Sequence, residues 1–182
     1  EAYRRSYFNE NNIQLATARA GNVIGGGDWS ENRLIPDALR AIDKNEPLII
    51  RHPKAIRPWQ HVLSPLEGYL LLAEKLYMNK DKFSEAWNFG PDNADSKSVQ
   101  WIADYLKSKR PNLNFIFKNE KNIREASTLK LDSSKAANRL EWSNRWDIKS
   151  SIQMTLEWHS EWLKQKDMRE VTRRQIESYV CT

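Results

Sequence analysis

Apolar residues along the chain follow two patterns: short continuous runs, and longer segments in which they recur every three or four positions. The short runs are bounded by turn residues, which is typical of largely buried strands. We predict strands over 13–24, 47–52, 85–91 and 114–118. The helical spacing predicts helices over 32–45, 64–79, 97–109, 132–142 and 147–167.

The two ends of the chain are also expected to be helical. Residues 1–10 have the character of the last turns of a helix, and 169–180 predict one more turn or two. Ser64, followed by Glu67, has the spacing of a capping box. Strands that alternate with helices indicate an α/β fold. Without an internal repeat or a low-complexity linker, residues 1–182 are expected to form one compact unit.

The composition limits the classes of protein to which this chain can belong. The net charge is +5, but the basic residues are scattered, so we do not expect a nucleic-acid partner. No apolar run approaches the ~20 residues of a membrane span, and no membrane partner is expected. One cysteine, Cys181, and three histidines far apart favour a reducing cytoplasm and no metal site. Glu1 stands where an initiator Met would be, which suggests part of a longer protein.

The glycine-rich stretch RAGNVIGGGDW, residues 19–29, follows the first predicted strand and holds four of the six glycines. It matches neither the G-x-G-x-x-G nor the Walker pattern, and the next helix starts only near Arg33. One interpretation is a ligand-facing turn at the carboxyl end of a strand, where open α/β sheets bind ligands. The other is a flexible connector whose glycines permit positive φ. Spacing alone favours neither.

A second stretch, HPKAIRPWQHV, follows Arg51 and gathers cationic donors over residues 51–61. Arg57 could hold a phosphate through two parallel hydrogen bonds. The alternative is a basic surface loop with one buried tryptophan, Trp59. Three further residues favour structural roles: Asn88 as a turn former, and Trp158 and His159 as packing residues of a helix.

These stretches together resemble the carboxyl half of extended short-chain dehydrogenase/reductases that act on nucleotide sugars. RLIPD, FSEAWNFGP and LKLDSSKAANRLEW also occur in the family's order and spacing, and the resemblance covers essentially all 182 residues. The pair GNVIGGGDW and RPWQHV is similar to the branch of 4,6-dehydratases that act on CDP-glucose. This implies NAD as cofactor and an internal redox dehydration of CDP-glucose to CDP-4-keto-6-deoxyglucose.

The resemblance also implies roles for matching positions. Ala20 and Gly21 would lie near the nicotinamide of NAD. Arg124 stands where the family has a histidine, so its contact with the nucleotide is a weaker expectation. The residues expected to bind the sugar nucleotide are Asn22, Arg33, Leu34, Ile35, Arg51, Arg57, Asn88 and Arg124.

The resemblance places the cofactor's glycine loop and the catalytic Tyr-x-x-x-Lys before Glu1. We therefore expect no Tyr-x-x-x-Lys pair and no catalytic residue in this chain, and we expect it to be inactive alone. Its first strand would leave an open edge, so we expect a homo-oligomer or association with the missing half. A sister nucleotide-sugar dehydratase or epimerase, and a non-catalytic nucleotide-binding module, are the alternatives.

Overall fold

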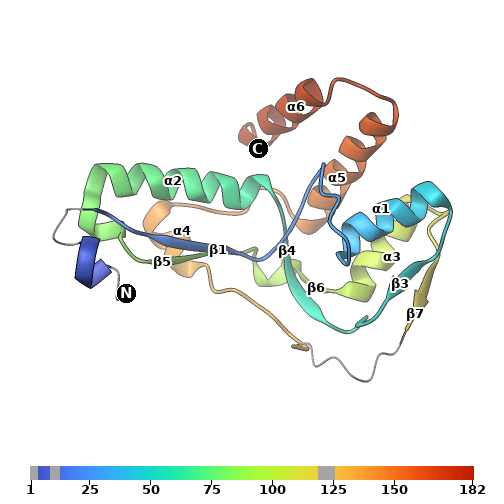
Figure 1. Cartoon of the computed structure of the whole chain (residues 1–182), viewed down its shortest axis with the longest axis horizontal. Coiled ribbons are helices and arrows are strands. Elements are labelled where there is room, and N and C mark those ends of the chain that lie inside the picture. The colour runs from blue at the N-terminus through green and yellow to red at the C-terminus, as the bar shows by residue number, and fades with distance from the viewer. Residues whose placement is uncertain (1–3, 9–12, 119–125) are drawn as a thin grey trace.

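The computed structural model describes residues 4–8, 13–118 and 126–182 (Figure 1). Its first two strands, β1 (Thr17–Ala20) and β2 (Asn22–Ile24), follow one another with only Gly21 between them. β1 pairs in parallel with β5 (Ala86–Phe89), whereas β2 pairs in parallel with β4 (Ile56–His61). The single strand predicted over 13–24 is therefore two strands of two different sheets, a correction to the sequence reading.

Gly21 is the point at which the chain changes sheets. Its backbone N–H donates to the carbonyl oxygen of Phe89 on β5, 3.3 Å away. A Cβ at this position would lie 2.4 Å from the carbonyl oxygen of Pro58 on β4. Because that neighbour is backbone and cannot move aside, only glycine lets the chain pass between β5 and β4 here.

The remaining strands form a smaller set. β6 (Ser96–Ser98) pairs antiparallel with β4, and β3 (Leu48–Ile50) pairs in parallel with β7 (Phe115–Phe117). The sequence analysis did not predict β4 or β6, since charged residues and Pro58 dominate their pattern. β4 is nevertheless almost completely buried, because it lies between β2 and β6.

Six α-helices cover these strands in the described ranges: α1 (Leu34–Lys44), α2 (Leu63–Asn79), α3 (Val99–Lys109), α4 (Ser134–Leu140), α5 (Ile148–Leu163) and α6 (Met168–Val180). The carboxylate of Asp167 caps α6 by accepting from the N–H groups of Arg169 and Glu170. α6 is thus longer than the turn or two expected. α2 begins one residue before Ser64, which lies inside the helix rather than at its cap.

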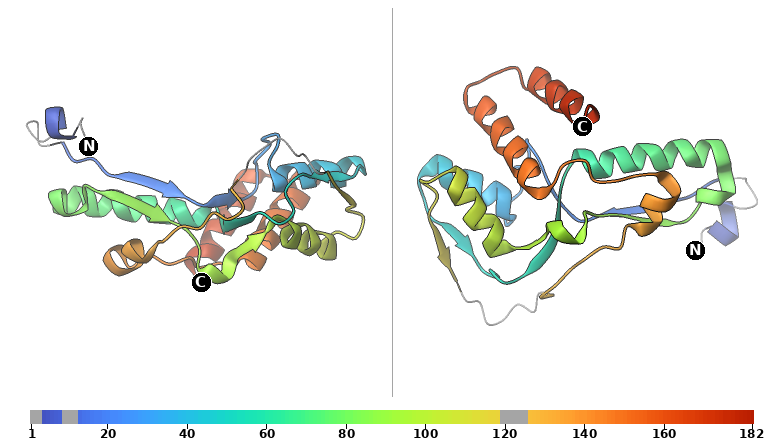
Figure 2. Two further views of the ribbon diagram at one scale, coloured as in Figure 1. Left: turned by 90° about the horizontal axis from the view of Figure 1, so that it is seen from below. Right: turned by 180° about the vertical axis from the view of Figure 1, so that it is seen from behind.

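The apolar side chains form two clusters. The helices that contribute to them, α1 and α3 for one and α2 and α4 for the other, lie toward opposite ends of the ribbon (Figures 1 and 2). The larger cluster joins α1, α3 and α5 to the strands, and its members include Ile24, Leu39, Ile50, Ile102 and Ile152. Trp87, Phe89, Leu140 and Trp142 belong to the second, between α2, α4 and β5. No helix in the described part of the chain combines the length and the apolar character that crossing a bilayer requires.

β1 is the least covered strand. Thr17, Ala18 and Arg19 are all exposed, although consecutive residues of a strand point to opposite faces. Among the described residues β5 is its one neighbour in the sheet. One edge of β1 is therefore open, as the sequence analysis expects of the first strand.

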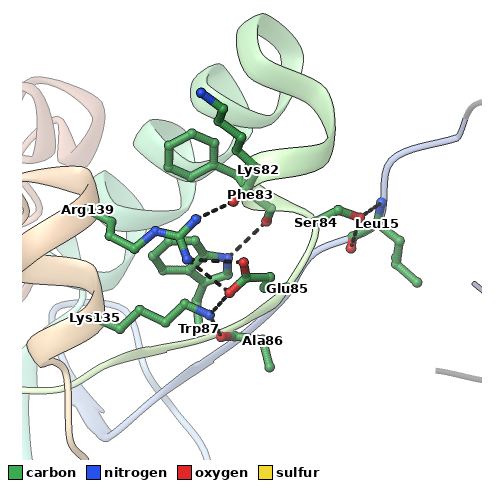
Figure 3. A network of polar contacts seen from close by, with 9 residues as sticks. All are labelled: Leu15, Lys82, Phe83, Ser84, Glu85, Ala86, Trp87, Lys135 and Arg139. Carbon is green, nitrogen blue, oxygen red and sulfur yellow. Dashed lines mark hydrogen bonds and ion pairs between the residues drawn. The ribbon is translucent and has the colours of Figure 1, made fainter.

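A network of charged residues fixes α4 against the start of β5 (Figure 3). The Glu85 carboxylate accepts from Arg139 Nη1 at 3.1 and 3.0 Å and pairs with Lys135 Nζ. The Arg139 guanidinium carbon lies 5.1 Å from the centre of the Trp87 ring, which adds a cation–π contact. Beside it, Ser84 Oγ donates to the Leu15 carbonyl at 2.9 Å and accepts from the Leu15 N–H at 3.1 Å.

His61, at the end of β4, is buried without full hydrogen bonding. Its Nδ1 accepts from the Leu63 N–H at 3.4 Å, and its ring meets Trp146 edge-on with centres 4.9 Å apart. Its Nε2 has no hydrogen-bond partner among the residues that the structure describes. Burial lowers the pKa of His61 from 6.5 to about 4. The ring is therefore neutral at pH 7, and protonating it would place an unpaired charge in the interior.

The Glu85 network predicts a modest, pH-dependent contribution to stability. Hydrogen bonds from Lys135 and Arg139 hold the pKa of Glu85 below its usual 4.5, so the network stabilises the fold above that pH and the effect is lost as pH falls through the lowered pKa. Glu85→Gln should lower the free energy of unfolding by less than about 1 kcal/mol at pH 7, because all three side chains are over a third exposed. Urea unfolding checks this. Glu74→Gln, which changes an exposed residue of α2, should leave the free energy of unfolding unchanged. If Glu85→Gln remains less stable than the wild type at acid pH, its effect does not come from the ionised carboxylate.

Burial of His61 predicts a second pH effect, over a different range. The pKa is about 6.5 in the unfolded chain and about 4 in the native protein. The neutral ring therefore contributes fully above pH 6.5, and about 3 kcal/mol is lost as pH falls from 6.5 to 4. In urea unfolding measured across this pH range, His61→Phe should lack this fall in the free energy of unfolding, whereas His52→Gln should keep it. If the free energy of unfolding falls equally with pH in the wild type and in His61→Phe, His61 does not titrate in this range.

Candidate functional site

One pocket of about 560 Å³ opens where β2, β3 and β4 meet the start of α1. Six of the eight residues expected to bind a sugar nucleotide line it, and so does Gly21. The six are Asn22, Arg33, Leu34, Ile35, Arg51 and Arg57. Residues that are up to 35 positions apart in the sequence are thus brought around one cavity.

The parallel strands position two of these side chains. Asn22 begins β2 and lies opposite Trp59 of β4 in the sheet register. Arg57 lies two residues before Trp59 on the same strand and is only 7% exposed. Its Nη1 donates to the Ile56 carbonyl at 2.8 Å. A guanidinium that is already dehydrated beside a pocket is a strong donor for an anion.

The segment before α1 holds two further arginines. Arg33 is extended, precedes the first helical residue and is 64% exposed along its side chain. Arg51, which follows β3, donates from Nη2 to the side-chain oxygen of Asn32 at 3.0 Å. Asn32 has a φ of +60°, a left-handed conformation that asparagine tolerates. The turn at Asn32 therefore orients Arg51 at the rim of the pocket.

The start of α1 contributes to the pocket as well. Leu34, Ile35 and Pro36, in its first turn, line the cavity. The first N–H groups of a helix have no intrahelical acceptor and carry partial positive charge, which favours an anion there. Together with three arginines, this end of the helix makes the pocket suited to a phosphate-bearing ligand.

Two carboxylates among the lining residues are already engaged. Asp37 pairs with Arg40, and Asp28 Oδ2 lies 3.9 Å from Arg33 Nη1. Burial alone would raise the pKa of Asp28, but hydrogen bonds from Ser30 and the charges of Arg33 and Arg40 hold it below its usual value. Asp28 is therefore ionised at neutral pH and partly balances the arginines.

The glycine-rich stretch faces the pocket in part. Gly25 and Asp28 line the pocket, as the first interpretation requires. Gly27 has a φ of +79°, so the conformational freedom named by the second interpretation is also used. The loop lies at the carboxyl end of β2 and is the wall of the pocket on that side.

Other expected residues lie elsewhere. Asn88, on β5, is not among the lining residues; its Nδ2 donates to the Asp132 carbonyl at 3.1 Å. Ala20 ends β1 beside the pocket without lining it. Arg124 lies outside the described residues. Ser127 and Leu129, shortly after it, hydrogen-bond the backbone of Ile56, next to Arg57.

A Tyr-x-x-x-Lys spacing does occur once in this chain, at Tyr105 and Lys109, although the sequence analysis assigned none. Both residues are on α3, and neither lines the pocket. Tyr105 stacks on Trp101 with ring centres 5.4 Å apart, and Lys109 Nζ lies 5.4 Å from the centre of the Tyr105 ring. In the structure this pair packs beside Trp101 on α3 and is not part of the pocket.

Sequence reasoning missed several lining residues, including Asp28, Asn32 and Val99. Asn32 carried a usable signal, since asparagine adopts a positive φ more readily than most residues. Val99 carried none, because it reaches the pocket from α3 through packing of a distant segment.

Comparisons with known proteins agree with this architecture. No family model matches the chain. CDP-glucose 4,6-dehydratase of Salmonella typhimurium is 44% identical over 185 aligned residues, which cover 98% of this chain and 52% of that protein.

Solved structures show the same fold at lower identity. The epimerase Mth375 of Methanothermobacter thermautotrophicus has a TM-score of 0.77 at 18% identity, over 93% of this chain and 49% of that one. A UDP-glucuronic acid 4-epimerase of Bacillus cereus, solved with UDP-glucuronic acid and NAD, has a TM-score of 0.74 at 16% identity, over 88% and 48%. The dTDP-glucose 4,6-dehydratase of Bacillus anthracis, solved with NAD, has a TM-score of 0.66 at 16% identity, over 88% and 47%.

The predicted α/β fold class is thereby confirmed. The chain spans about half the length of the relatives it matches. Over nearly all of its own length it is similar in sequence to the C-terminal half of CDP-glucose 4,6-dehydratase, and it has the fold of the C-terminal part of extended short-chain epimerases and dehydratases.

Proposed function

We propose that this chain is the sugar-nucleotide-binding part of an NAD-dependent 4,6-dehydratase that acts on CDP-glucose. The observation that carries the proposal is the pocket, in which three arginines and Asn22 converge from separate segments. The 44% identity to CDP-glucose 4,6-dehydratase supports the choice of substrate.

The pocket's side chains suit the diphosphate of such a ligand. Arg57 is held in place before binding and can donate two parallel hydrogen bonds to phosphate oxygens. Arg33 and Arg51 would approach from the rim, and Asn22 offers both a donor and an acceptor to the sugar side. The free energy of binding would then come chiefly from charge-assisted hydrogen bonds, and those of Arg57 would form where water is largely excluded.

NAD would meet this chain only at the junction of β1 and β2. Gly21 lines the pocket and Ala20 is half-buried beside it, so small residues leave the backbone accessible where a nicotinamide would lie. When bound, NAD supplies the acceptor that takes a hydride from the sugar and returns it. This chain's own residues would bind and orient the substrate and exclude water from it.

The proton transfers of the reaction would need residues outside this chain. By the resemblance, the tyrosine that deprotonates the sugar hydroxyl and the lysine that lowers its pKa precede Glu1. We therefore infer that the 182 residues bind the sugar nucleotide without turning it over. A sister dehydratase or epimerase would differ in the preferred base, and a non-catalytic module would bind with no catalytic partner.

Binding to the 182-residue chain tests the assignment. Isothermal titration should show CDP-glucose bound more tightly than UDP-glucose, and far more tightly than cytidine, which lacks the diphosphate. Arg57→Ala should weaken CDP-glucose about tenfold or more, since it removes charge-assisted hydrogen bonds. Arg169→Ala, an exposed arginine of α6, is the matched control and should not change affinity.

Two results would contradict this proposal. Equal affinity for CDP-glucose and cytidine would show that the pocket does not bind the diphosphate. A preference for UDP-glucose would favour the sister enzymes. In the full-length protein, Asn22→Ala should weaken sugar-nucleotide binding more than NAD binding. Equal losses would mean that this end of β2 serves the cofactor.

The open edge of β1 supports a second part of the proposal, association through that strand. Thr17 donates its N–H to the carbonyl of Glu85, the residue before β5, so the N–H of the next residue, Ala18, points to the open edge. Unpaired strand groups and three exposed residues form a template for another strand. We propose that a second copy or the missing half covers it.

Light scattering tests the association directly. The wild-type chain should be an oligomer, and Ala18→Pro should shift it toward the monomer, because proline removes the N–H at the open edge. Thermal unfolding of the variant checks that it still folds. A monodisperse wild-type monomer would rule out self-association.

A further inference from the structure

The loop Gly25–Asp28, called here the glycine loop, lies between the pocket and α5. Its Gly25 and Asp28 line the pocket. Its Gly26 faces the other way, toward Trp158 of α5. Figure 1 shows the chain between β2 and α1 passing beside α5.

The contact between Gly26 and Trp158 leaves no space between them. A Cβ on Gly26 would lie 2.1 Å from both Cγ and Cδ2 of the indole, so the ring lies directly against the glycine backbone. The next residue, Gly27, has a positive φ, and its added Cβ would be 3.5 Å from the same ring. The indole therefore forms a flat support behind the two residues at the tip of the loop.

Trp158 is held by one hydrogen bond of its own and by the anchoring of the helix that carries it. Its Nε1 donates to Thr172 Oγ1 of α6 at 3.0 Å. The adjacent His159 meets Asp43 of α1, with Nε2 and Oδ2 3.0 Å apart, so α5 is tied to the helix that follows the loop. The support is thus anchored to α6 and to α1 at once.

The end of the glycine loop has a further contact with the same helix. Trp29, the residue after Asp28, lies with its ring centre 4.5 Å from that of Trp162 and 6.5 Å from that of Trp158. Both the tip and the exit of the loop therefore rest on α5. In the loop's own sequence, three successive glycines offer little resistance to movement.

We propose that Trp158 is a positioning residue: it holds the glycine loop in the conformation that forms one wall of the pocket, and so sets the affinity for the sugar nucleotide. This rests on the proposed function for the identity of the ligand. Without the indole, the loop would have to be ordered at the moment of binding, and that entropy would be lost from the affinity.

Two measurements on the 182-residue chain test the proposal, one of which needs no ligand. The backbone order parameters of the Gly26 and Gly27 amides, from nitrogen-15 relaxation, should fall from about 0.85 to below about 0.6 in Trp158→Ala. The affinity for CDP-glucose should fall about tenfold in the same variant, as expected for ordering a short loop on binding. Trp158→Phe keeps a flat ring against Gly26 and should restore both values.

The matched control is Trp101→Ala, which also removes a half-buried tryptophan from a helix but belongs neither to the loop nor to the pocket lining. It should lower the thermal midpoint without changing the order parameters or the affinity. Equal effects of Trp101→Ala and Trp158→Ala on affinity would mean that general stability, and not the loop, is responsible.

A pair of variants adds a test by compensation. Gly26→Ala should weaken CDP-glucose binding, because the new methyl group clashes with the indole and displaces the loop. Adding Trp158→Ala to it should cost little more, since the clash is gone. If the two losses simply multiply, Gly26 and Trp158 do not act through their contact.

The outcomes separate this inference from the proposed function. If the wild type fails to bind CDP-glucose, the proposed function fails for this chain, while the order parameters still decide whether Trp158 holds the loop. If CDP-glucose binds and Trp158→Ala leaves both readouts unchanged, the positioning role is wrong. Should Trp158→Ala not fold, Thr172→Val, which removes the hydrogen-bond partner of the indole, carries the same two measurements with smaller effects in the same direction.

Discussion

A single carbonyl oxygen, that of Phe89, joins the two halves of this fold. It accepts from the N–H of Gly21 at 3.3 Å and from Nε2 of Gln60 at 2.7 Å. These donors come from the β1–β2 junction and from β4, while Phe89 itself ends β5. Buried carbonyls need such partners, and here one acceptor holds three segments in register at the point where the sheets diverge. The pocket forms on one side of that point and the exposed strand β1 lies on the other.

The close approach of Gly21 to Pro58 follows from the same junction. Proline lacks an N–H, so β4 has one fewer donor there. The carbonyl oxygen of the same residue, Pro58, faces the chain at Gly21, 2.4 Å from where a Cβ would be. The sequence shows both residues, but not that they meet. This is why the glycine before Asn22 looked like part of a longer strand.

The local sequence was sufficient to predict a helix where burial of one face sets the spacing of its apolar residues. The helices α1, α3 and α5 were predicted to within a few residues, since apolar side chains recur along one side of each. β4 was not predicted, because its burial comes from strands on both sides rather than from its own composition. The length of α6 depends on Asp167 and on Tyr179, whose hydroxyl reaches Ser64 of α2 at 3.1 Å. Arg57 was singled out from its own stretch of cationic residues and Arg33 from the resemblance to a family, whereas Val99 reaches the pocket only by tertiary packing.

The arginines of the pocket differ in how much freedom they keep, and this has a kinetic consequence. Arg33 is 64% exposed along its side chain, whereas Arg57 is 7% exposed and already dehydrated. An exposed charge at the mouth of a cavity acts at long range, and its influence is screened by salt. A buried charge acts only on contact and mainly slows departure. For an anionic ligand, Arg33 would therefore govern how often it arrives, and Arg57 how long it stays.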